Sequence, residues 1–531
     1  MSLTMQQLLA QHTERDNLAV VHDTGDGRQL RWTWKEYIER ASRQAATIIE
    51  HLDTRRPLHV GALLGNTPAM LTAIAAAALG GYVLCGINDT RRGGGLLADI
   101  TTADVQILLT DAEHRHLLDH LDLATVRVID VDDSRWQHRC DGAGALTPIH
   151  RAQPADPFMM IFTSGTSGDP KAVLVSHHMV VFAGRNLVDR FGLDSGDVCY
   201  LAMPMFHSNG IVAGFAPAVT AGATMAPSKF SASGFLDEIR SYRATYMNYV
   251  GKPLAYVLAT PARPDDSENT LRVAFGNEAS DQDIERFSQR FGVRVVDAFG
   301  STENAVIIIR EEGTPPGSVG RGLPGVAIYH SDPIAECPPA VFDDHGVLTN
   351  PDAAIGELVN TAGAGFFSGY YNNEEASAER MRAGIYWSGD LGYKDSDGWI
   401  YLAGRTADWM RVDGENLTSA PIERILQRHP DISRVAIYPV PDDLVGDQIM
   451  AAIVPRSGSR LDPGEFGEFL TRQEDLSPKA WPRFVRIATE LPTTATNKIL
   501  KRVLVSEGTD VRSDILWTRL GREHAYRVVG D

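Results

Sequence analysis

A nine-residue loop rich in glycine and hydroxyl groups has the composition of a phosphate-binding site. It reads Thr163-Ser-Gly-Thr-Ser-Gly-Asp-Pro-Lys171 and stands between two apolar runs, 158–162 and 172–175, which we predict to be strands. Gly165 and Gly168 lack a Cβ, so the backbone can turn through positive φ and present its N–H donors to a large group. The hydroxyls and the terminal lysine add donors and a positive charge that suit a polyphosphate. No Gly-Lys-Ser/Thr ends the loop, so it is not of the Walker type; a flexible polar turn is the alternative.

A second polar cluster, Asp297-Ala-Phe-Gly-Ser-Thr-Glu303, follows a predicted strand at 293–296. In an open α/β sheet, ligands bind beyond the carboxyl ends of the strands. Phe299 offers a flat apolar face for a purine, Thr302 can donate a hydrogen bond, and Glu303 is a hard oxygen ligand suited to Mg²⁺. A strand end with a solvated acid is the alternative.

Two further polar residues have the types that complete a nucleotide site. Asp390 follows a glycine, and we expect a tight turn there whose carboxylate accepts hydrogen bonds from ribose hydroxyls. Arg405 can pair with ribose or phosphate oxygens. A Gly-Asp step is also typical of an ordinary turn, and a single arginine is also typical of a protein surface. The two residues therefore indicate a nucleotide site only in combination with the other motifs.

Together, these segments resemble the motifs of the adenylate-forming superfamily, which comprises acyl-CoA synthetases, luciferases and peptide-synthetase adenylation domains. The motifs stand in the family's order between roughly residues 30 and 505. The resemblance implies that catalysis falls to Lys498, His207, Thr302 and Glu303, with Mg²⁺ on Glu303. It implies that ATP and AMP are bound by Thr163, Ser164, Gly165, Thr166, Ser167, Gly168, Lys171, Gly276, Asn277, Glu278, Asp297, Ala298, Phe299, Gly300, Ser301, Thr302, Asp390 and Arg405.

The same resemblance implies a small domain that rotates on a short hinge and brings CoA to the site. The hinge position is Ala407, where the family often carries Asp or Lys, and a small residue still absorbs the backbone change. Gly414, Glu415 and Asn416 resemble the loop that lines the tunnel for the pantetheine arm of CoA.

The residues around His207 bear on which acid is activated. Amino-acid-activating members of the family usually carry Phe-Asp here, whereas this chain has Phe206-His207, so a partner for an amine is missing and a plain carboxylic acid is favoured. The segments 245–251 and 276–277 resemble the fatty-acid-transport-protein branch, the very-long-chain acyl-CoA synthetases, whose bacterial relatives act on long fatty acids or on steroid side-chain acids. The expected acyl pocket comprises Phe206, His207, Gly210, Gly214, Tyr249 and Gly251, and helix packing is the alternative reason for the two glycines at 210 and 214.

Length and pattern predict two domains. A chain of 531 residues is too long for one core. Apolar runs at 59–64 and 105–109 alternate with helical segments, one of which begins at the capping box Thr33-Trp-Lys-Glu36. We therefore expect an α/β fold: a large domain, 1–404, of parallel or mixed sheets covered by helices, and a small mobile α+β domain, 405–531.

Composition narrows the class further. The formal net charge of −18 argues against a general binder of nucleic acid. The four cysteines are scattered without metal-ligand spacing and fit a reducing, cytoplasmic compartment. The alanine-rich stretch 68–87 approaches membrane length, but we predict a buried helix, a turn and a strand there instead of a transmembrane segment. A peripheral membrane contact and a dimer both stay open.

These expectations combine into one function with two alternatives. The chain is expected to be an ATP-dependent acyl-CoA synthetase that uses ATP, Mg²⁺ and CoA. It would convert a long-chain fatty acid, or a bulky apolar acid such as a steroid side-chain acid, to its thioester through an acyl-adenylate. The alternatives are an acyl-AMP ligase that loads a carrier protein and a non-catalytic lipid-binding or uptake protein.

Overall fold

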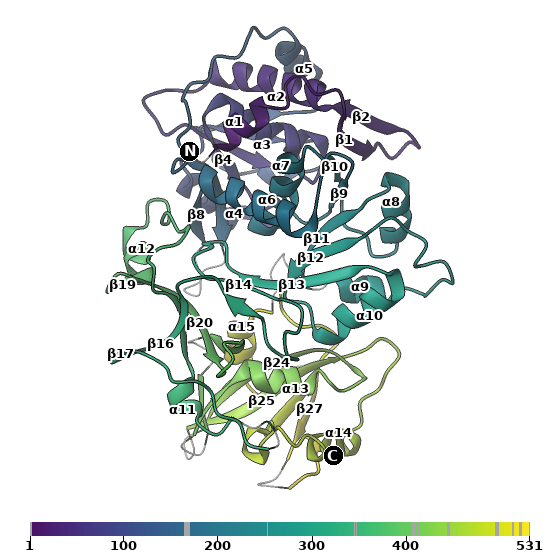
Figure 1. Ribbon diagram of the computed structural model, residues 1–531, viewed down its shortest axis with the longest axis vertical. Helices are drawn as coiled ribbons and strands as arrows, with labels where there is room; N and C mark the ends of the chain where they lie inside the picture. The colour runs from purple at the N-terminus through teal and green to yellow at the C-terminus, as the bar shows by residue number, and fades with distance from the viewer. Residues whose placement is uncertain are drawn as a thin grey trace. The chain divides into compact units, whose positions relative to one another are not determined.

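The computed structural model shows an α/β chain that divides into two compact units (Figure 1). The first unit comprises residues 1–305 and 364–380, and the second comprises 306–363 and 381–531. The domain boundary expected at Arg405 falls inside the second unit, between two of its sheets, and stays a prediction. The structure describes residues 3–163, 170–251, 253–344, 346, 348–405, 409–412, 415–442, 446–493, 499–511, 514–519 and 523–529.

A six-stranded sheet in the first unit carries the glycine- and hydroxyl-rich loop. Its strands lie in the order β6 (Arg127–Asp130), β5 (Ile107–Thr110), β3 (His59–Leu63), β4 (Val83–Gly86), β7 (Pro157–Thr163) and β8 (Lys171–Ser176). Neighbours are parallel except β7 and β8, which are antiparallel and place Thr163 opposite Lys171. The predicted strands on both sides of the loop are therefore confirmed.

A second sheet of the first unit carries the cluster that begins at Asp297. Its strands lie in the order β13 (Arg294–Gly300), β12 (Val273–Asn277), β11 (Tyr246–Val250), β9 (Val198–Leu201), β10 (Thr224–Pro227), β1 (Leu18–Asp23) and β2 (Gln29–Thr33). Neighbours from β13 to β1 are parallel, and β2 is antiparallel to β1. Because these strands are parallel, β11, β12 and β13 all end at one edge of the sheet. The predicted strand before the cluster is confirmed as part of β13.

Helices connect these strands. They are α1 (Met5–Ala10), α2 (Trp34–Ile49), α3 (Pro68–Gly80), α4 (Gly93–Thr102), α5 (Ser134–Asp141), α6 (His177–Phe191), α7 (Ala216–Ala221), α8 (Phe235–Tyr242), α9 (Pro253–Leu258), α10 (Asp281–Phe291) and α12 (Glu374–Arg380), with a 3₁₀ helix η1 (Arg115–Leu118) and a π-helix η2 (Gly210–Phe215). The capping box that opens α2 is confirmed: the Glu36 N–H donates to the Thr33 hydroxyl at 3.2 Å, and the Thr33 N–H donates to the Glu36 carboxylate at 2.7 Å.

The alanine-rich stretch forms the buried helix, turn and strand that its sequence predicts. α3 has Pro68 in its first turn and is capped after Gly80 by Gly81, whose φ of +78° is left-handed. Residues 70–80 are all buried, so the apolar character of this helix serves the core. Across the described ranges, no helix combines the length and hydropathy needed to cross a membrane.

The second unit contains a sheet whose described strand pairs are all antiparallel. Its strands lie in the order β17 (Ile334–Glu336), β16 (Val326–Ser331), β18 (Gly356–Asn360), β20 (Ile385–Lys394) and β19 (Met381–Arg382), with β21 (Ile400–Arg405) also paired to β20. A short antiparallel pair, β14 (Ile307–Ile309) and β15 (Arg321–Gly322), and the helix α11 (Pro351–Ala354) belong to the same unit.

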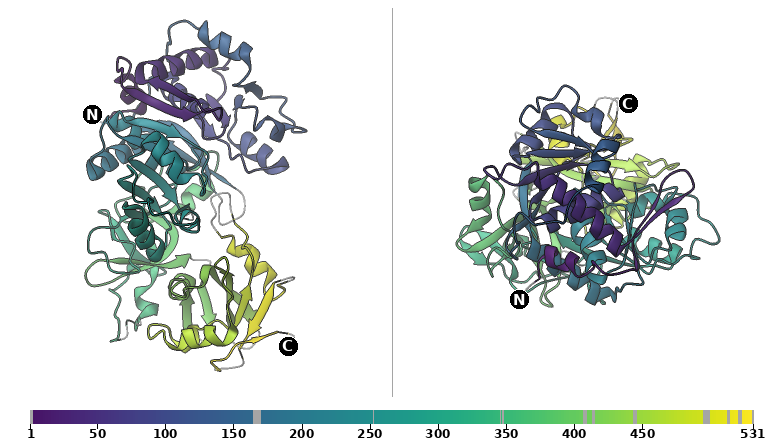
Figure 2. Two further views of the ribbon diagram at one scale, coloured as in Figure 1. Left: turned by 90° about the vertical axis from the view of Figure 1, so that its right-hand side faces the viewer. Right: turned by 90° about the horizontal axis from the view of Figure 1, so that it is seen from above.

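The C-terminal part of the second unit is a small α+β domain, as predicted. Its sheet has the order β23 (Glu415–Thr418), β22 (Trp409–Val412), β25 (Gly446–Pro455), β26 (Phe484–Ile487), β27 (Ile515–Thr518) and β28 (Arg527–Val528), with β24 (Ile432–Asp442) paired to β25. Green and yellow stretches of the chain lie side by side in it, as the left view of Figure 2 shows. The helices are α13 (Ser419–Leu426), α14 (Pro463–Thr471), α15 (Lys501–Glu507) and the 3₁₀ helix η4 (Pro478–Ala480).

Candidate active site

The carboxyl edge of β11, β12 and β13 gathers several of the predicted nucleotide-binding residues. Gly276 and Asn277 end β12 beside Tyr249 of β11. A Cβ on Gly276 would lie 2.1 Å from the Tyr249 carbonyl oxygen, so only glycine permits this close approach of the two strands. The Tyr249 hydroxyl donates to Asp297 Oδ1 at 2.8 Å, which ties β11 to β13. Tyr249 is fully buried in the core, and its assignment to an acyl pocket stays a prediction.

The cluster that begins at Asp297 continues along β13 and past its end. Ala298 and Phe299 are half-buried, and Gly300 is exposed. Glu278 comes directly after the neighbouring strand β12 and has a left-handed φ of 66°, so the chain turns sharply there. Such turns beyond the carboxyl ends of parallel strands are where ligands bind in open α/β sheets.

His207 lies on the segment that follows β9 and neighbours this cluster. The hydroxyls of Ser208 and Thr302 are 3.2 Å apart, which joins the two segments. The Phe206 and His207 rings are in contact, with centroids 4.5 Å apart. His207 Nε2 is buried and has no hydrogen-bond partner among the residues that the structure describes. Burial lowers the pKa of His207 to about 4, so its imidazole is neutral at pH 7.

Glu303 has one carboxylate oxygen fixed by a tyrosine. The residue is 8% exposed, and its Oε1 accepts a 2.8 Å hydrogen bond from the Tyr370 hydroxyl. Arg380 Nε donates to the same hydroxyl oxygen at 3.3 Å. Burial, and then the charge of Glu303, raise the pKa of Tyr370, so its hydroxyl stays a donor. No hydrogen bond from the described part of the chain engages Oε2 of Glu303, which suits a hard cation such as Mg²⁺.

Lys171 at the start of β8 lies near the ring of the same tyrosine. Its ammonium nitrogen is 5.2 Å from the centroid of the Tyr370 ring and 4.0 Å from Glu379 Oε2. Backbone hydrogen bonds join the segment 369–371 to β8. The fold therefore brings the lysine of the predicted phosphate loop and the carboxylate of Glu303 to one aromatic ring.

Three amide side chains link the elements of this edge, and sequence reasoning missed two of them. Asn248 in β11 is fully buried and donates to Asn209 Oδ1 at 2.7 Å. Asn209 in turn donates to Asn277 Oδ1 at 3.3 Å. A single amide within the otherwise apolar or aromatic run 246–250 was the available signal for Asn248, because a buried polar group in a central strand requires a partner. Tyr370 was also missed, and the sequence carries no local signal for its contact.

The glycines expected in the acyl pocket pack against protein atoms. A Cβ on Gly210 would lie 2.4 Å from the Pro204 carbonyl oxygen, and one on Gly214 would lie 3.0 Å from Asn248 Oδ1. Gly251 has a left-handed φ of +61° just after β11. Packing and backbone conformation account for these glycines, and their place in an acyl pocket stays a prediction.

In the second unit, Asp390 does not lie in the tight turn that we expected. Gly389 and Asp390 belong to β20, at an irregularity in its pairing with β18, where Gly389 has a φ of +77°. The expectation was wrong because a strand can absorb a Gly-Asp step as a bulge when the strands on both of its sides continue to pair with it. The Gly389 N–H donates to Glu357 Oε1 at 2.6 Å. Asp390 stands opposite Arg405 in the register of β20 and β21, so the backbones of both predicted ribose-binding residues are neighbours.

The remaining predicted residues can be placed only in part. Ser301 is half-buried after β13, and the backbones of Glu415 and Asn416 belong to β23. The residues outside the described ranges are Ser164, Gly165, Thr166, Ser167, Gly168, Ala407, Gly414 and Lys498.

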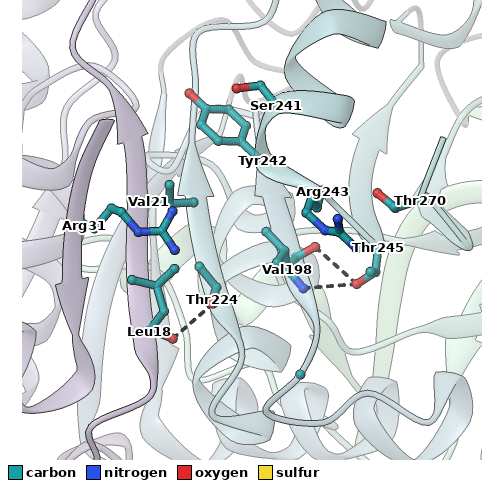
Figure 3. A pocket seen from close by; sticks show the side chains of 11 residues that line it. Leu18, Val21, Arg31, Val198, Thr224, Ser241, Tyr242, Arg243, Thr245 and Thr270 are labelled. Carbon is teal, nitrogen blue, oxygen red and sulfur yellow. Dashed lines mark hydrogen bonds between the residues drawn. The ribbon is translucent and has the colours of Figure 1, made fainter. Parts of the chain in front are cut away.

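A separate hollow lies at the opposite edge of the second sheet (Figure 3). It is lined at the amino ends of the strands, by residues such as Val198, Thr224 and Thr245. The Thr245 hydroxyl accepts from the Val198 N–H at 3.0 Å and therefore serves the sheet itself. The predicted site residues of this sheet, such as Asn277 and Asp297, lie at its carboxyl edge, so this hollow is distinct from the candidate active site.

Comparison with known proteins defines the family. The sequence model of AMP-binding enzymes matches residues 8–371, and the model of the AMP-binding enzyme C-terminal domain matches residues 421–498. The chain therefore belongs to the AMP-binding enzyme family. The expected domain boundary at Arg405 lies between these two matches.

Two of the similar proteins are named as a CoA ligase and a CoA synthetase. The chain is 49% identical over 487 residues to the medium/long-chain-fatty-acid–CoA ligase FadD17 of Mycobacterium marinum, covering 91% of this chain and 93% of the relative. It is 43% identical to the steroid-22-oyl-CoA synthetase of Rhodococcus jostii, covering 90% and 87%. The crystal structure of ATP-bound MatB from Rhodopseudomonas palustris has the same fold, with a TM-score of 0.82, 24% identity, and coverage of 96% and 100%.

Proposed function

We propose that this AMP-binding enzyme is an ATP-dependent acid–thiol ligase. It activates a carboxylic acid as an acyl-adenylate, releases pyrophosphate, and transfers the acyl group to CoA with release of AMP. The observation that carries this proposal is the near full-length similarity to two relatives whose names both describe the joining of an acid to CoA.

The acid is an apolar one, a medium- or long-chain fatty acid or a steroid side-chain acid. His207 is a neutral imidazole and no carboxylate stands in its place, so position 207 offers no anionic partner for a substrate amine. As a neutral group, His207 can donate one hydrogen bond from Nε2 to a carboxylate or phosphate oxygen. Its Nε2, which no described residue engages, supports this role, since a buried polar atom without a partner is costly unless a ligand supplies one.

The phosphate groups of ATP are held by the loop 163–171 and by Mg²⁺ on Glu303. Mg²⁺, when bound, neutralises the negative charge of the phosphates. Glu303 fits this role because Tyr370 engages only one of its oxygens. Lys171 adds a positive charge near the same ring. Lys498 is proposed to bridge the substrate carboxylate and the α-phosphate, and the segment 414–416 is proposed to accompany CoA.

The test is release of pyrophosphate with ATP, Mg²⁺ and a panel of fatty, aromatic and steroid acids, each with and without CoA. Turnover only with CoA, together with formation of acyl-CoA, is the expected result. The Lys498→Ala variant should lose most of the first half-reaction. Lys229→Ala is the matched control, because that side chain is 85% exposed and its salt bridge among the described residues is to Glu113 on the surface.

Other outcomes would replace the proposal. Release that stops near one equivalent in the presence of CoA would favour an acyl-AMP ligase that loads a carrier protein. Absence of release with every acid, combined with tight binding of a fatty acid, would favour a non-catalytic lipid-binding protein.

A further inference from the structure

Asn66 contacts the segment that leads to His207 through three hydrogen bonds. Its Nδ2 donates to the carbonyl oxygens of Leu201 and Met203, at 3.2 and 2.8 Å. Its Oδ1 accepts from the Met205 N–H at 3.1 Å. β9 ends at Leu201, so the backbone groups that follow are no longer paired in the sheet. One amide side chain therefore supplies the partners that this segment needs.

The turn that carries Asn66 is itself held by hydrogen bonds that involve Asp111 and His114. The Gly65 N–H donates to Asp111 Oδ2 at 3.3 Å, and Asp111 Oδ1 lies 2.6 Å from His114 Nδ1. The His114 backbone N–H also donates to Asp111, at 2.9 Å. The His114 ring packs against the turn, since a Cβ on Gly65 would lie 3.4 Å from its Cε1. Gly65, Asp111 and His114 thus form a brace for this turn. Asp111 follows β5, so the brace belongs to the six-stranded sheet, whereas β9 belongs to the second sheet of the unit.

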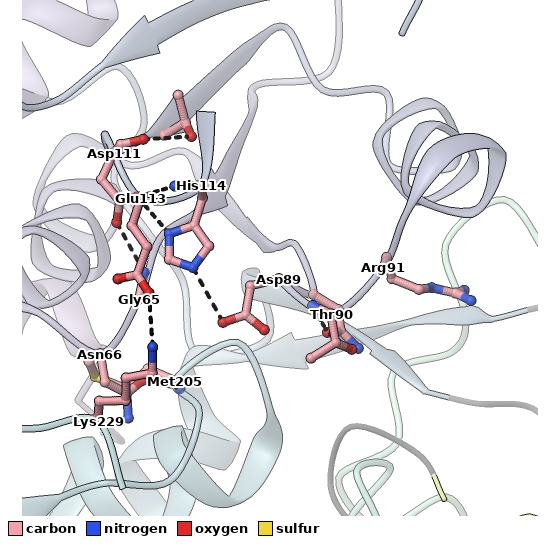
Figure 4. Close-up of polar contacts among 12 residues, drawn as sticks. Gly65, Asn66, Asp89, Thr90, Arg91, Asp111, Glu113, His114, Met205 and Lys229 are labelled. Atoms are coloured by element: carbon pink, nitrogen blue, oxygen red, sulfur yellow. Dashed lines mark hydrogen bonds and ion pairs between the residues drawn. The ribbon is translucent and has the colours of Figure 1, made fainter. Parts of the chain in front are cut away.

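His114 also connects this brace to a second carboxylate. Its Nε2 lies 3.6 Å from Asp89 Oδ2 (Figure 4). The hydrogen bond to Asp111 and then the nearby Asp89 carboxylate raise the pKa of His114 to about 9, so it is an imidazolium at neutral pH. The Asp111 and His114 side chains are each 10% exposed, so salt screens their attraction only weakly.

We propose that Asn66 is the positioning residue of His207, and that the Asp111–His114 pair holds Asn66 in place. The proposal rests on the proposed function, because it takes His207 as a group that contacts the substrate or the α-phosphate. Asn66 fixes the backbone at Met205, two residues before His207. A misplacement of about 1 Å at a group that contacts a reacting substrate can cost about 100-fold in rate.

A double-mutant cycle on Asn66→Ala and His207→Ala separates positioning from simple stabilisation. The measurement is the single-turnover rate of pyrophosphate release, together with KM for ATP and the melting temperature. Asn66→Ala is expected to lower the rate about 10- to 100-fold with little change in KM for ATP. In the His207→Ala background the same change should cost less than about 2-fold, because no imidazole remains to be misplaced.

A matched control and a second variant keep the test decisive. Asn186→Ala removes an exposed amide that, within the described ranges, bonds to the Phe182 carbonyl of its own helix, and it should leave the rate unchanged. If Asn66→Ala does not fold, His114→Gln tests the same brace. It should lower the rate about 3- to 10-fold in the wild-type background and have almost no effect beside His207→Ala.

Two results would overturn the inference. If the losses from Asn66→Ala and His207→Ala multiply in an otherwise active enzyme, Asn66 does not act through His207, while the proposed function stands. If the wild-type protein releases no pyrophosphate with any acid, the proposed function fails and this inference fails with it.

Discussion

Replacing Tyr370 with phenylalanine isolates a single hydrogen bond to Glu303. The substitution deletes the hydroxyl that donates to Glu303 Oε1 at 2.8 Å and keeps the aromatic ring. Tyr370 is 5% exposed and its ring contacts Phe367, with centroids 5.1 Å apart, so the packing should be retained. Glu303 is 8% exposed, so water can replace the lost donor only in part.

The expected magnitude follows from the charge of the acceptor. A hydrogen bond to an ionised group contributes about 1.5–3 kcal/mol, so the free energy of unfolding should fall by about 2 kcal/mol. Loss of a group that orients a metal ligand typically costs about 10- to 100-fold in metal affinity or activity. The MgATP concentration that gives half-maximal pyrophosphate release should therefore rise at least about 10-fold.

The neighbouring tyrosine provides a matched control. The Tyr371 hydroxyl donates to Asp104 Oδ2, also at 2.8 Å, so Tyr371→Phe deletes the same group from the same kind of acceptor. Asp104 takes no part in the candidate site. Tyr371→Phe should lower the free energy of unfolding by a comparable amount and leave the MgATP dependence unchanged.

The comparison of the two variants decides the question. Pyrophosphate release as a function of MgATP, measured beside urea unfolding curves, gives both quantities for each protein. An unchanged MgATP dependence in Tyr370→Phe, or an equal shift in both variants, would refute the argument that Tyr370 orients Glu303 for the metal.

Three further predictions concern stability. Thr33→Ala removes the capping box of α2 and should lower the free energy of unfolding by about 1 kcal/mol, seen as a lower urea midpoint; an unchanged midpoint would contradict it. Gly276→Ala would place a Cβ 2.1 Å from a carbonyl oxygen of the adjacent strand, so circular dichroism should show a protein that melts far below the wild type, whereas Gly94→Ala, with nothing within 4 Å, should melt normally. Burial lowers the pKa of His177 from 6.5 in the unfolded chain to about 4 in the folded protein. Between these two values the unfolded chain binds more protons than the folded protein, so the free energy of unfolding decreases as the pH falls below about 6.5. The difference in unfolding free energy between pH 7 and pH 5 should therefore shrink by about 2 kcal/mol in His177→Gln, and an unaltered difference would count against the buried neutral imidazole.

Local sequence patterns predicted the elements and the places where chemistry was to be sought. The capping box at Thr33, the buried helix after Pro68 and the strands on both sides of the loop 163–171 depend on residues within a few positions of one another. The cluster 297–303 was correctly placed at the end of a strand for the same reason. The motifs and their order carried the resemblance to the adenylate-forming superfamily, because they too are properties of the chain without its fold.

The contacts that give these residues a defined environment depend on the tertiary structure. Tyr370 reaches Glu303 across 67 residues of sequence, and Asn66 reaches Met205 across 139, so no local pattern announces either hydrogen bond. The bulge at Asp390 likewise exists only because β18 and β21 pair with β20 on its two sides. Sequence fixes which groups are present and which local structures they favour. Burial, hydrogen-bond partners and pKa values depend on which distant groups the fold brings within a few ångströms.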